Sequence, residues 1–275
     1  MSKIINALTV DLEDWFCVYN FRGYIVRTDW EKCESRIEQN TDRLLNLFDK
    51  HNVKATFFVL GWVAERVPDL IKKIDSAGHE IASHGYSHQL VTEMTRESFA
   101  EDLKKSLDIL YNIIQKEVIG FRAPSFSITN KTLWALDILE QQGIKYDSSI
   151  YPTGYHPDYG IADFPLSPQN VTEKLVEFPM SCSRIGGIKI PCSGGGYFRS
   201  LPYSVTKYLF NKINLENRSF VFYIHPWEID PQQPRIRLPL AKSFRHYNNL
   251  GKTYRRIDML LSDFSFTTIR KVLQL

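Results

Sequence analysis

The chain has 275 residues and a mass of 32.0 kDa, which fits one large α/β or all-β domain, or two ordinary domains. Its content of 43% hydrophobic and 24% charged residues is near the globular average and excludes a disordered chain, a collagen-like repeat and a coiled coil. The net charge of +3 is far from the basic charge that nucleic-acid binding requires, so we expect no nucleic-acid partner.

The chain shows no signal for a membrane or for export. No apolar run reaches the roughly 18 to 20 residues of a membrane span. The opening residues carry carboxylates where a signal peptide keeps an uncharged hydrophobic region. We therefore predict a cytoplasmic protein without a transmembrane segment, and the sequence does not indicate its oligomeric state.

Short β-rich runs alternate with helical patterns along the first half of the chain. The run 5–11 is apolar and β-branched, and leucines then recur at helical spacing after a loop. Pro68 and Gly78 are typical of the first turn and the end of a helix. We predict strands over 5–11, 55–61, 79–85, 118–124 and 144–149, separated by helices over 41–51, 68–79, 95–115 and 130–143.

The second half begins with residues 151–170, whose Pro, Gly, Tyr and Asp content predicts an ordered loop rather than a linker. The runs 174–181 and 219–225 predict further strands. Alternating strands and helices indicate a mainly parallel sheet covered on its faces. We predict an α/β fold, a distorted (β/α) barrel of about seven parallel strands, in a single domain over 1–275; an open sheet is the alternative.

Polar residues follow five of the predicted strands. Because the loops at the carboxyl ends of parallel strands carry the site in such folds, these residues are the ones to inspect. They are Asp11-Leu12-Glu13-Asp14, Ser83-His84-Gly85-Tyr86-Ser87-His88, Arg122-Ala123-Pro124-Ser125, Asp147-Ser148-Ser149 and His225-Pro226-Trp227-Glu228.

His84 and His88 indicate a metal site. Two imidazoles four residues apart can meet on one face of a helical turn and share one ion, although solvated or capping histidines produce the same spacing. A carboxylate from the end of the first strand would complete a set of two histidines and one carboxylate with room for water. That set is typical of a catalytic site rather than a closed structural one.

Three further residues suit amide hydrolysis. A metal ion lowers the pKa of a water molecule, and Asp11 suits the base that removes its proton, although a strand-end Asp also commonly caps a loop. Arg122 is a natural partner to hold Asp11 ionised, with a surface ion pair as its alternative. His225 can protonate the leaving amine as general acid, whereas an isolated histidine there would more often be a core residue.

These motifs, in this order, resemble the polysaccharide deacetylases of carbohydrate esterase family four, which have the NodB-type fold. VDLED stands where that family has paired aspartates, SHGYSH matches its two-histidine metal motif, FRAP its arginine motif and YIHP its terminal histidine motif. The resemblance runs from Leu8 to Phe266. EFPMS, PCSGGGYFRSLPY and FYIHPWEID further resemble the branch found with bacterial exopolysaccharide and exosortase gene clusters.

The resemblance implies a metal-dependent hydrolase that removes N-acetyl groups from an N-acetylated amino sugar in a glycan or glycan precursor. Asp11 would be the base, Arg122 its support, His225 the acid, and the backbone N–H of Ser125 an oxyanion donor. The divalent ion would be zinc, with cobalt or nickel as alternatives. Its ligands would be His84, His88 and either Glu13 or Asp14, because the adjacent Asp-Asp of the family is spread over four residues here.

The remaining expectations concern the substrate. Pro124, Asp147, Tyr197 and Trp227 are candidates to contact it, with Asp147 alternatively behind a catalytic residue. Trp15 and Phe198 are further candidates for stacking on a sugar, and core packing is the alternative for Trp15 and Trp227. The glycines of GGIKIPCSGGGYF would let a loop pass close to substrate. Cytoplasmic residence favours a lipid-linked, nucleotide-linked or short oligosaccharide precursor. The alternative functions are hydrolysis of a small cyclic amide, such as an imide or allantoin, and silent carbohydrate binding.

Overall fold

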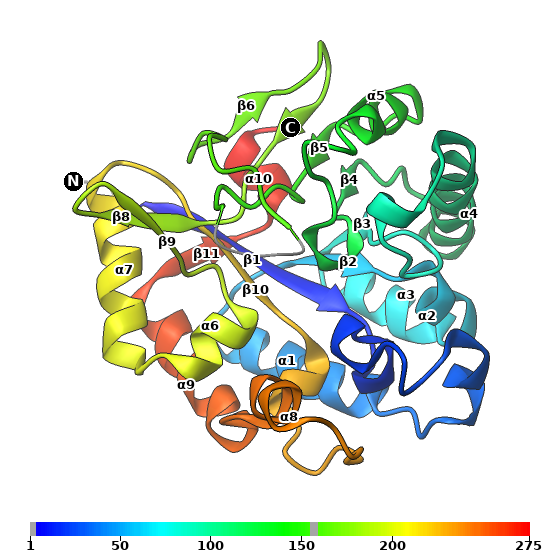
Figure 1. Cartoon of the computed structure of the whole chain (residues 1–275), viewed down its shortest axis with the longest axis horizontal. Coiled ribbons are helices and arrows are strands. Elements are labelled where there is room, and N and C mark those ends of the chain that lie inside the picture. Colours follow the sequence, from blue (N-terminus) through cyan, green and yellow to red (C-terminus); the bar gives the residue numbers. More distant parts are fainter. Residues whose placement is uncertain (1–3, 155–158) are drawn as a thin grey trace.

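A nine-stranded, mostly parallel sheet forms the centre of the protein, seen in a computed structural model that describes residues 4–154 and 159–275 (Figure 1). Every pair of neighbouring strands in the sheet is parallel except β6 with β7. The order is β10 (Val221–Ile224), β1 (Ile5–Leu12), β2 (Thr56–Val59), β3 (Glu80–Ser83), β4 (Gly120–Phe121), β5 (Tyr146–Asp147), β7 (Val176–Glu177) and β6 (Gln169–Asn170), and β11 (Ser265–Thr267) also pairs with β1.

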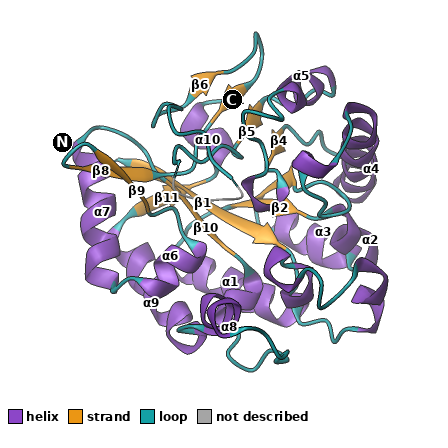
Figure 2. Ribbon diagram, in the orientation of Figure 1, coloured by secondary structure: helices purple, strands orange, loops and turns teal. Residues whose placement is uncertain are grey.

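Helices lie around the outside of this curled sheet (Figure 2). They are α1 (Ile37–Lys50), α2 (Gly61–Arg66), α3 (Pro68–Ser76), α4 (Arg96–Ile114), α5 (Trp134–Gln141), α6 (Gly195–Ser200), α7 (Tyr203–Leu215), α8 (Leu240–Tyr247), α9 (Leu250–Asp263) and α10 (Ile269–Leu273). A separate hairpin joins β8 (Cys182–Ile185) to β9 (Ile188–Pro191). Within residues 4–154 and 159–275, no helix combines the length and the apolar character that crossing a bilayer requires.

The predicted α/β fold with a curled parallel sheet is confirmed. The sheet stays open, because β10 and β6 end its order and do not pair with each other among the described residues. In the predicted loop 151–170, Gln169–Asn170 form β6, and residues 155–158 lie outside the described part of the chain. The helices after residue 190 were not predicted.

Strand β1 lies in the middle of the sheet and is buried along its length after Ile5. Its amino end is fixed by Asn6, whose amide accepts a hydrogen bond from Phe220 N at 3.0 Å and from Asn214 Nδ2 at 2.8 Å. Parallel neighbours on both sides set its register. The carboxyl end of β1 therefore emerges between β10 and β2, where Asp11 and Glu13 lie.

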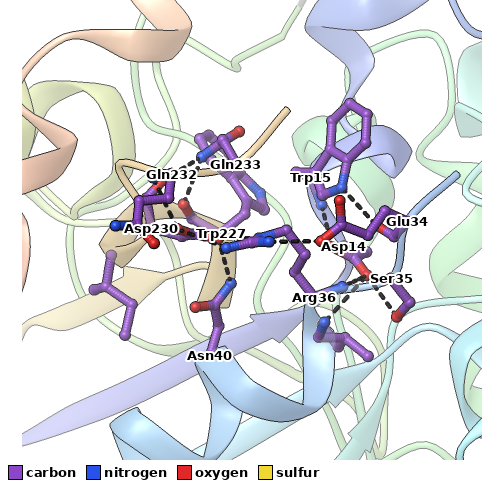
Figure 3. A network of polar contacts seen from close by, with 12 residues as sticks. Asp14, Trp15, Glu34, Ser35, Arg36, Asn40, Trp227, Asp230, Gln232 and Gln233 are labelled. Atoms are coloured by element: carbon purple, nitrogen blue, oxygen red, sulfur yellow. Dashed lines mark hydrogen bonds and ion pairs between the residues drawn. The ribbon is translucent and has the colours of Figure 1, made fainter. Parts of the chain in front are cut away.

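Asp14 fixes the turn that follows β1. Its Oδ1 accepts a hydrogen bond from Trp15 N at 2.8 Å, and its Oδ2 accepts from Ser35 Oγ at 2.9 Å, Arg36 N at 2.8 Å and Ile37 N at 3.1 Å (Figure 3). A carboxylate at this place satisfies the free amides that begin helix α1.

Arg36 extends the same network across the fold. Its Nε donates to Asp230 Oδ2 at 2.5 Å, and Asn40 donates to the same oxygen at 3.2 Å (Figure 3). Asp230 ends the short 3-10 helix after β10. The loops that follow β1 and β10 are therefore tied together through the first turn of α1.

The glycines before α6 serve a close approach between backbones. Gly194 has φ +145°, and a Cβ added to it would lie 2.0 Å from the carbonyl oxygen of Tyr223 in β10. Tyr223 N also donates to Ser193 O at 2.9 Å. Gly196 has open space around its Cα. The chain at Gly194 thus passes against a strand, which sets the place of α6.

We expect Gly194→Ala to lower the free energy of unfolding by at least about 2 kcal/mol, because the added methyl meets the Tyr223 carbonyl and the backbone conformation is strained. The matched variant Gly196→Ala should change it by less than about 1 kcal/mol. Urea unfolding followed by circular dichroism measures both. Equal stability of the two variants would contradict this account.

Candidate metal centre and active site

Glu13, His84 and His88 form a cluster that can hold a metal ion. Each offers one ligand atom, and the three atoms lie within 4.8 Å of one another. Glu13 Oε2 lies 2.6 Å from His88 Nε2, yet this buried oxygen has no partner in hydrogen-bond geometry among the described residues. A short contact between a carboxylate oxygen and an imidazole nitrogen, without a hydrogen bond between them, fits two metal ligands whose lone pairs point at one cation.

The two histidines meet through an irregular loop, and the predicted helical turn is wrong. Gly85 has φ +70° and His88 has φ +55°, which are backbone conformations that a right-handed helical turn does not contain. Asp102 of α4 stabilises the turn by accepting hydrogen bonds from Tyr86 N at 2.7 Å and Ser87 N at 3.1 Å. The ring centroids of His84 and His88 are 5.4 Å apart.

His84 is held in the form that a metal requires. Its Nδ1–H donates to the Arg122 carbonyl at 2.7 Å, which leaves Nε2 for an ion. Burial lowers the pKa of His84 to about 3, and repulsion from His88 adds to this effect. The imidazole is therefore neutral at ordinary pH, as a ligand must be.

The structure brings Glu13, and not Asp14, into the cluster. Both oxygens of Asp14 accept hydrogen bonds from the start of α1 and from Trp15. Burial raises the pKa of Glu13, but attraction to His88 and then to His225 outweighs burial, and its net pKa is lowered. Glu13 is thus an ionised, buried carboxylate beside two imidazoles.

Asp11 is paired with a buried arginine. Nη1 of Arg122 donates to Asp11 Oδ1 at 2.6 Å and to Thr9 Oγ1 at 2.8 Å, and the guanidinium is 0% exposed. Nε of Arg122 donates to Ser148 O at 3.0 Å. This bonding orients Asp11 so that Oδ2 lies 3.9 Å from Nε2 of His225.

His225 is held by two charged residues, Glu228 and Arg199, that were not predicted from the sequence. Its Nδ1–H donates to Glu228 Oε2 at 2.8 Å, and Glu228 Oε1 accepts from Arg199 Nε at 2.6 Å. The other ring nitrogen, Nε2, lies 3.3 Å from Glu13 Oε1. The ring therefore presents Nε2 to the same space as the metal cluster and Asp11.

The charges around His225 favour its protonated form. Burial lowers the pKa of His225, but the hydrogen bond to Glu228 and its negative charge raise the net value to about 9. For Glu228, burial raises the pKa, and Arg199 and His225 outweigh this and lower it to about 2. His225 is therefore a cation at neutral pH, as a general acid requires.

A cavity of about 560 Å³ joins these groups. Of the predicted residues, Asp11, Glu13, His84, His88, Ser125, Tyr197, His225 and Trp227 line it. Aromatic side chains that were not predicted add to its wall, namely Tyr19, Phe126, Tyr159, Tyr223 and Phe244. A space of this size with an aromatic wall suits a ligand larger than a single small ring.

Two predicted substrate contacts lie away from this cavity. Pro124 and Asp147 are not among the described residues that line it. Asp147 is fully buried behind Arg122, where its Oδ1 accepts a hydrogen bond from Ser149 Oγ at 2.5 Å. Burial raises its pKa to about 6.

Other side chains were missed or misplaced for lack of a local signal. Phe198 packs in the hydrophobic core instead of stacking on a sugar, and Trp15 also packs there, which was the alternative given for it. Arg199 reaches Glu228 from α6, and no sequence pattern links the two. Glu228 could have been predicted from its spacing, because a carboxylate three residues after a histidine can accept a hydrogen bond from that imidazole.

Two family models match the chain. A family model described as polysaccharide deacetylase matches residues 28–146, which hold His84, His88 and Arg122. Residues 28–146 are therefore similar to the polysaccharide deacetylase family over somewhat less than half of the chain. A second family model, a domain of unknown function named DUF3473, matches residues 148–274, which hold His225. The resemblance to polysaccharide deacetylases is confirmed, and the exopolysaccharide branch stays a prediction.

Two curated relatives carry deacetylase names. The chain is 34% identical to a peptidoglycan deacetylase of Helicobacter pylori over 44% of its own length and 41% of the relative. It is 29% identical to a peptidoglycan-N-acetylglucosamine deacetylase of Bacillus cereus over 39% of its own length and 44% of the relative. The chain thus spans about two fifths of the length of these relatives.

Solved structures share the fold. A crystal structure from Mycobacterium smegmatis, provisionally assigned as a polysaccharide deacetylase, has a TM-score of 0.61 at 19% identity, covering 100% of this chain and 93% of that one. An allantoinase has a TM-score of 0.62 at 16% identity, covering 98% and 89%. At these identities the likeness shows the fold alone.

The choice between Glu13 and Asp14 has a direct test. We expect Glu13→Gln to weaken zinc binding at least about tenfold, because it removes a charged ligand. Asp14→Asn should keep the zinc but lower the free energy of unfolding by about 1 to 3 kcal/mol through the lost cap of α1. Metal titration and urea unfolding measure these effects. Loss of zinc from Asp14→Asn with retention in Glu13→Gln would reverse the assignment.

The support of His225 predicts a pH effect. A raised pKa keeps His225 protonated until pH rises through that value, so the acid form is lost on the alkaline side. Glu228→Gln removes the anion that raises the pKa, and we expect the alkaline limb of kcat/KM to move to lower pH. An alkaline limb unchanged in this variant would show that Glu228 does not control the acid.

Proposed function

We propose that the protein is a metal-dependent hydrolase that removes N-acetyl groups from an N-acetylated amino sugar in a glycan or glycan precursor. The observation that carries the proposal is the meeting of a two-histidine, one-carboxylate cluster with an arginine-held Asp11 and a cationic His225 in one cavity. The deacetylase names of the relatives support the same reaction.

The donor set of Glu13, His84 and His88 fits zinc, with cobalt or nickel as alternatives, since imidazole and carboxylate are ligands of all three. Three protein ligands leave open positions, as in catalytic sites. The ion would supply Lewis acidity, which polarises a carbonyl oxygen and lowers the pKa of water.

Asp11 and His225 each carry out one of the two proton transfers that the reaction needs. Asp11 accepts the proton that water loses as it attacks the acetamide carbonyl, and Arg122 holds Asp11 in place for it. His225 donates its Nε2 proton to the amide nitrogen, so that the C–N bond breaks and leaves a free amine and acetic acid, which ionises to acetate in water. Balance is kept, because one proton is taken and one is given.

Ser125 is proposed to stabilise the oxyanion through its backbone N–H. It lines the cavity and has a left-handed conformation with φ +52°. Its amide donates no hydrogen bond within the described part of the chain, which leaves the N–H for a substrate oxygen.

The size and lining of the cavity favour a sugar over the cyclic amide alternative. We also propose that residues 1–275 act as one catalytic domain, because β10 and β11 of the second half pair with β1 of the first. Tyr197 and Trp227 are proposed to contact the sugar. A cytoplasmic location, with a precursor glycan as substrate, completes the proposal.

The central test is acetate release from N-acetylglucosamine oligomers with and without a chelator, with allantoin as the competing substrate. His225→Ala should lower turnover by about 10² to 10⁴-fold and leave metal content unchanged. His51→Ala, at a site that pairs with Asp258 outside the cavity, is the matched control and should keep full turnover. Undiminished turnover in His225→Ala would refute the acid role, and cleavage of allantoin alone would refute the substrate class.

A further inference from the structure

One segment of the chain concentrates positive charge. Residues 231–257 contain seven Lys and Arg and no Asp or Glu, whereas the whole chain holds 34 basic and 31 acidic residues. Outside this segment, acidic residues therefore outnumber basic ones. Arg235, Arg237 and Lys242 are exposed and form no ion pair with any acidic residue in the described ranges.

The same segment exposes large apolar side chains. In α8, Leu240 is 90% exposed and Phe244 is 65% exposed, and their four-residue spacing places them on one face of the helix. Tyr24, 45% exposed, lies beside this helix, with Lys242 Nζ 5.3 Å from its ring centroid. Single exposed apolar residues are ordinary, but an apolar helix face flanked by unpaired cations is not.

This surface borders the catalytic cavity. Phe244 and Tyr19 line the cavity, and Asn20 Nδ2 donates to Lys242 O at 3.0 Å. Figure 1 shows α8 beside the end of β10, on the side of the sheet where β1 also ends. The apolar and basic surface of α8 is therefore continuous, through Phe244, with the wall of the cavity that holds His225.

The inner side of α8 is firmly packed. His246 is buried, its Nε2 lies 2.8 Å from Gln233 Oε1, and its ring stacks on Trp227 at 4.4 Å with an interplanar angle of 10°. Trp227 stacks in turn on His225 at 5.2 Å. Leu240 and Phe244 are therefore exposed on a helix whose opposite side packs against the active site.

We propose that the α8 rim, defined as Tyr24, Arg237, Leu240, Lys242 and Phe244, docks on an anionic membrane surface. The apolar face would enter the boundary between headgroups and acyl chains, while the flanking cations pair with lipid phosphates. The cavity then opens towards the bilayer and takes a glycan carried by a membrane lipid. This substrate class rests on the proposed function; the docking itself does not.

The test is cosedimentation of the full chain with vesicles of phosphatidylcholine alone or with about one third phosphatidylglycerol. We expect binding to the anionic vesicles only, weakened by salt. Leu240→Ser and the double variant Arg237→Gln with Lys242→Gln should each weaken it at least about tenfold. The control for Leu240→Ser is Leu215→Ser, because Leu215 is 83% exposed and lies next to Asn214 at the amino end of β1. The control for the double variant is Lys131→Gln with Lys174→Gln, at two exposed lysines.

Several results would overturn the docking. The first two are absence of binding to anionic vesicles, and equal binding by the rim variants and the control variants. A third is binding to the soluble polyanion heparin that is as strong as binding to the vesicles and is unchanged by Leu240→Ser. A fourth is self-association in sedimentation velocity that Leu240→Ser abolishes. None of the substituted residues lines the cavity, so acetate release from a soluble N-acetylated oligosaccharide should stay within about twofold in every variant. Vesicle binding without acetate release would overturn the proposed function alone, and acetate release without vesicle binding would overturn the docking alone.

Discussion

The buried guanidinium of Arg122 is the constraint on which the site depends. It donates to Asp11 and Thr9 of β1 and to Ser148 after β5, and its own carbonyl accepts from His84 after β3. One residue thus holds together three strand ends that are far apart in sequence. Because the charge has no contact with solvent, removing its partner Asp11 would leave a buried cation uncompensated, which is strongly unfavourable.

Three carboxylates within four residues have three different environments. Asp11 is paired with Arg122, Glu13 faces two imidazoles, and Asp14 caps α1. The strand geometry explains the first two, since residues two apart in an extended chain share a face. The third follows from the turn after β1, which points Asp14 away from the cavity and towards backbone amides.

The two halves of the chain contribute different parts of the site. The first half supplies Asp11, the three ligand candidates and Arg122, whereas the second supplies His225 with its Glu228 and Arg199 support, and much of the aromatic wall. The second half also supplies α8, whose His246 stacks on Trp227, and Trp227 stacks in turn on His225. The surface around the cavity is therefore attached directly to the proposed acid.

The sequence by itself determined the parallel α/β sheet. Strands that are buried on both faces appear in the sequence as short apolar runs, and these runs alternate with segments of helical periodicity. It also determined which residue types end each strand, and the structure brings Asp11, His84, His88 and His225 together as their positions predicted. Only the tertiary structure placed Glu13 rather than Asp14 beside His84 and His88, and brought Arg199 to Glu228. Those outcomes depend on which hydrogen-bond donor, distant in sequence, reaches each carboxylate. The local periodicity of a sequence does not indicate such long-range hydrogen bonds.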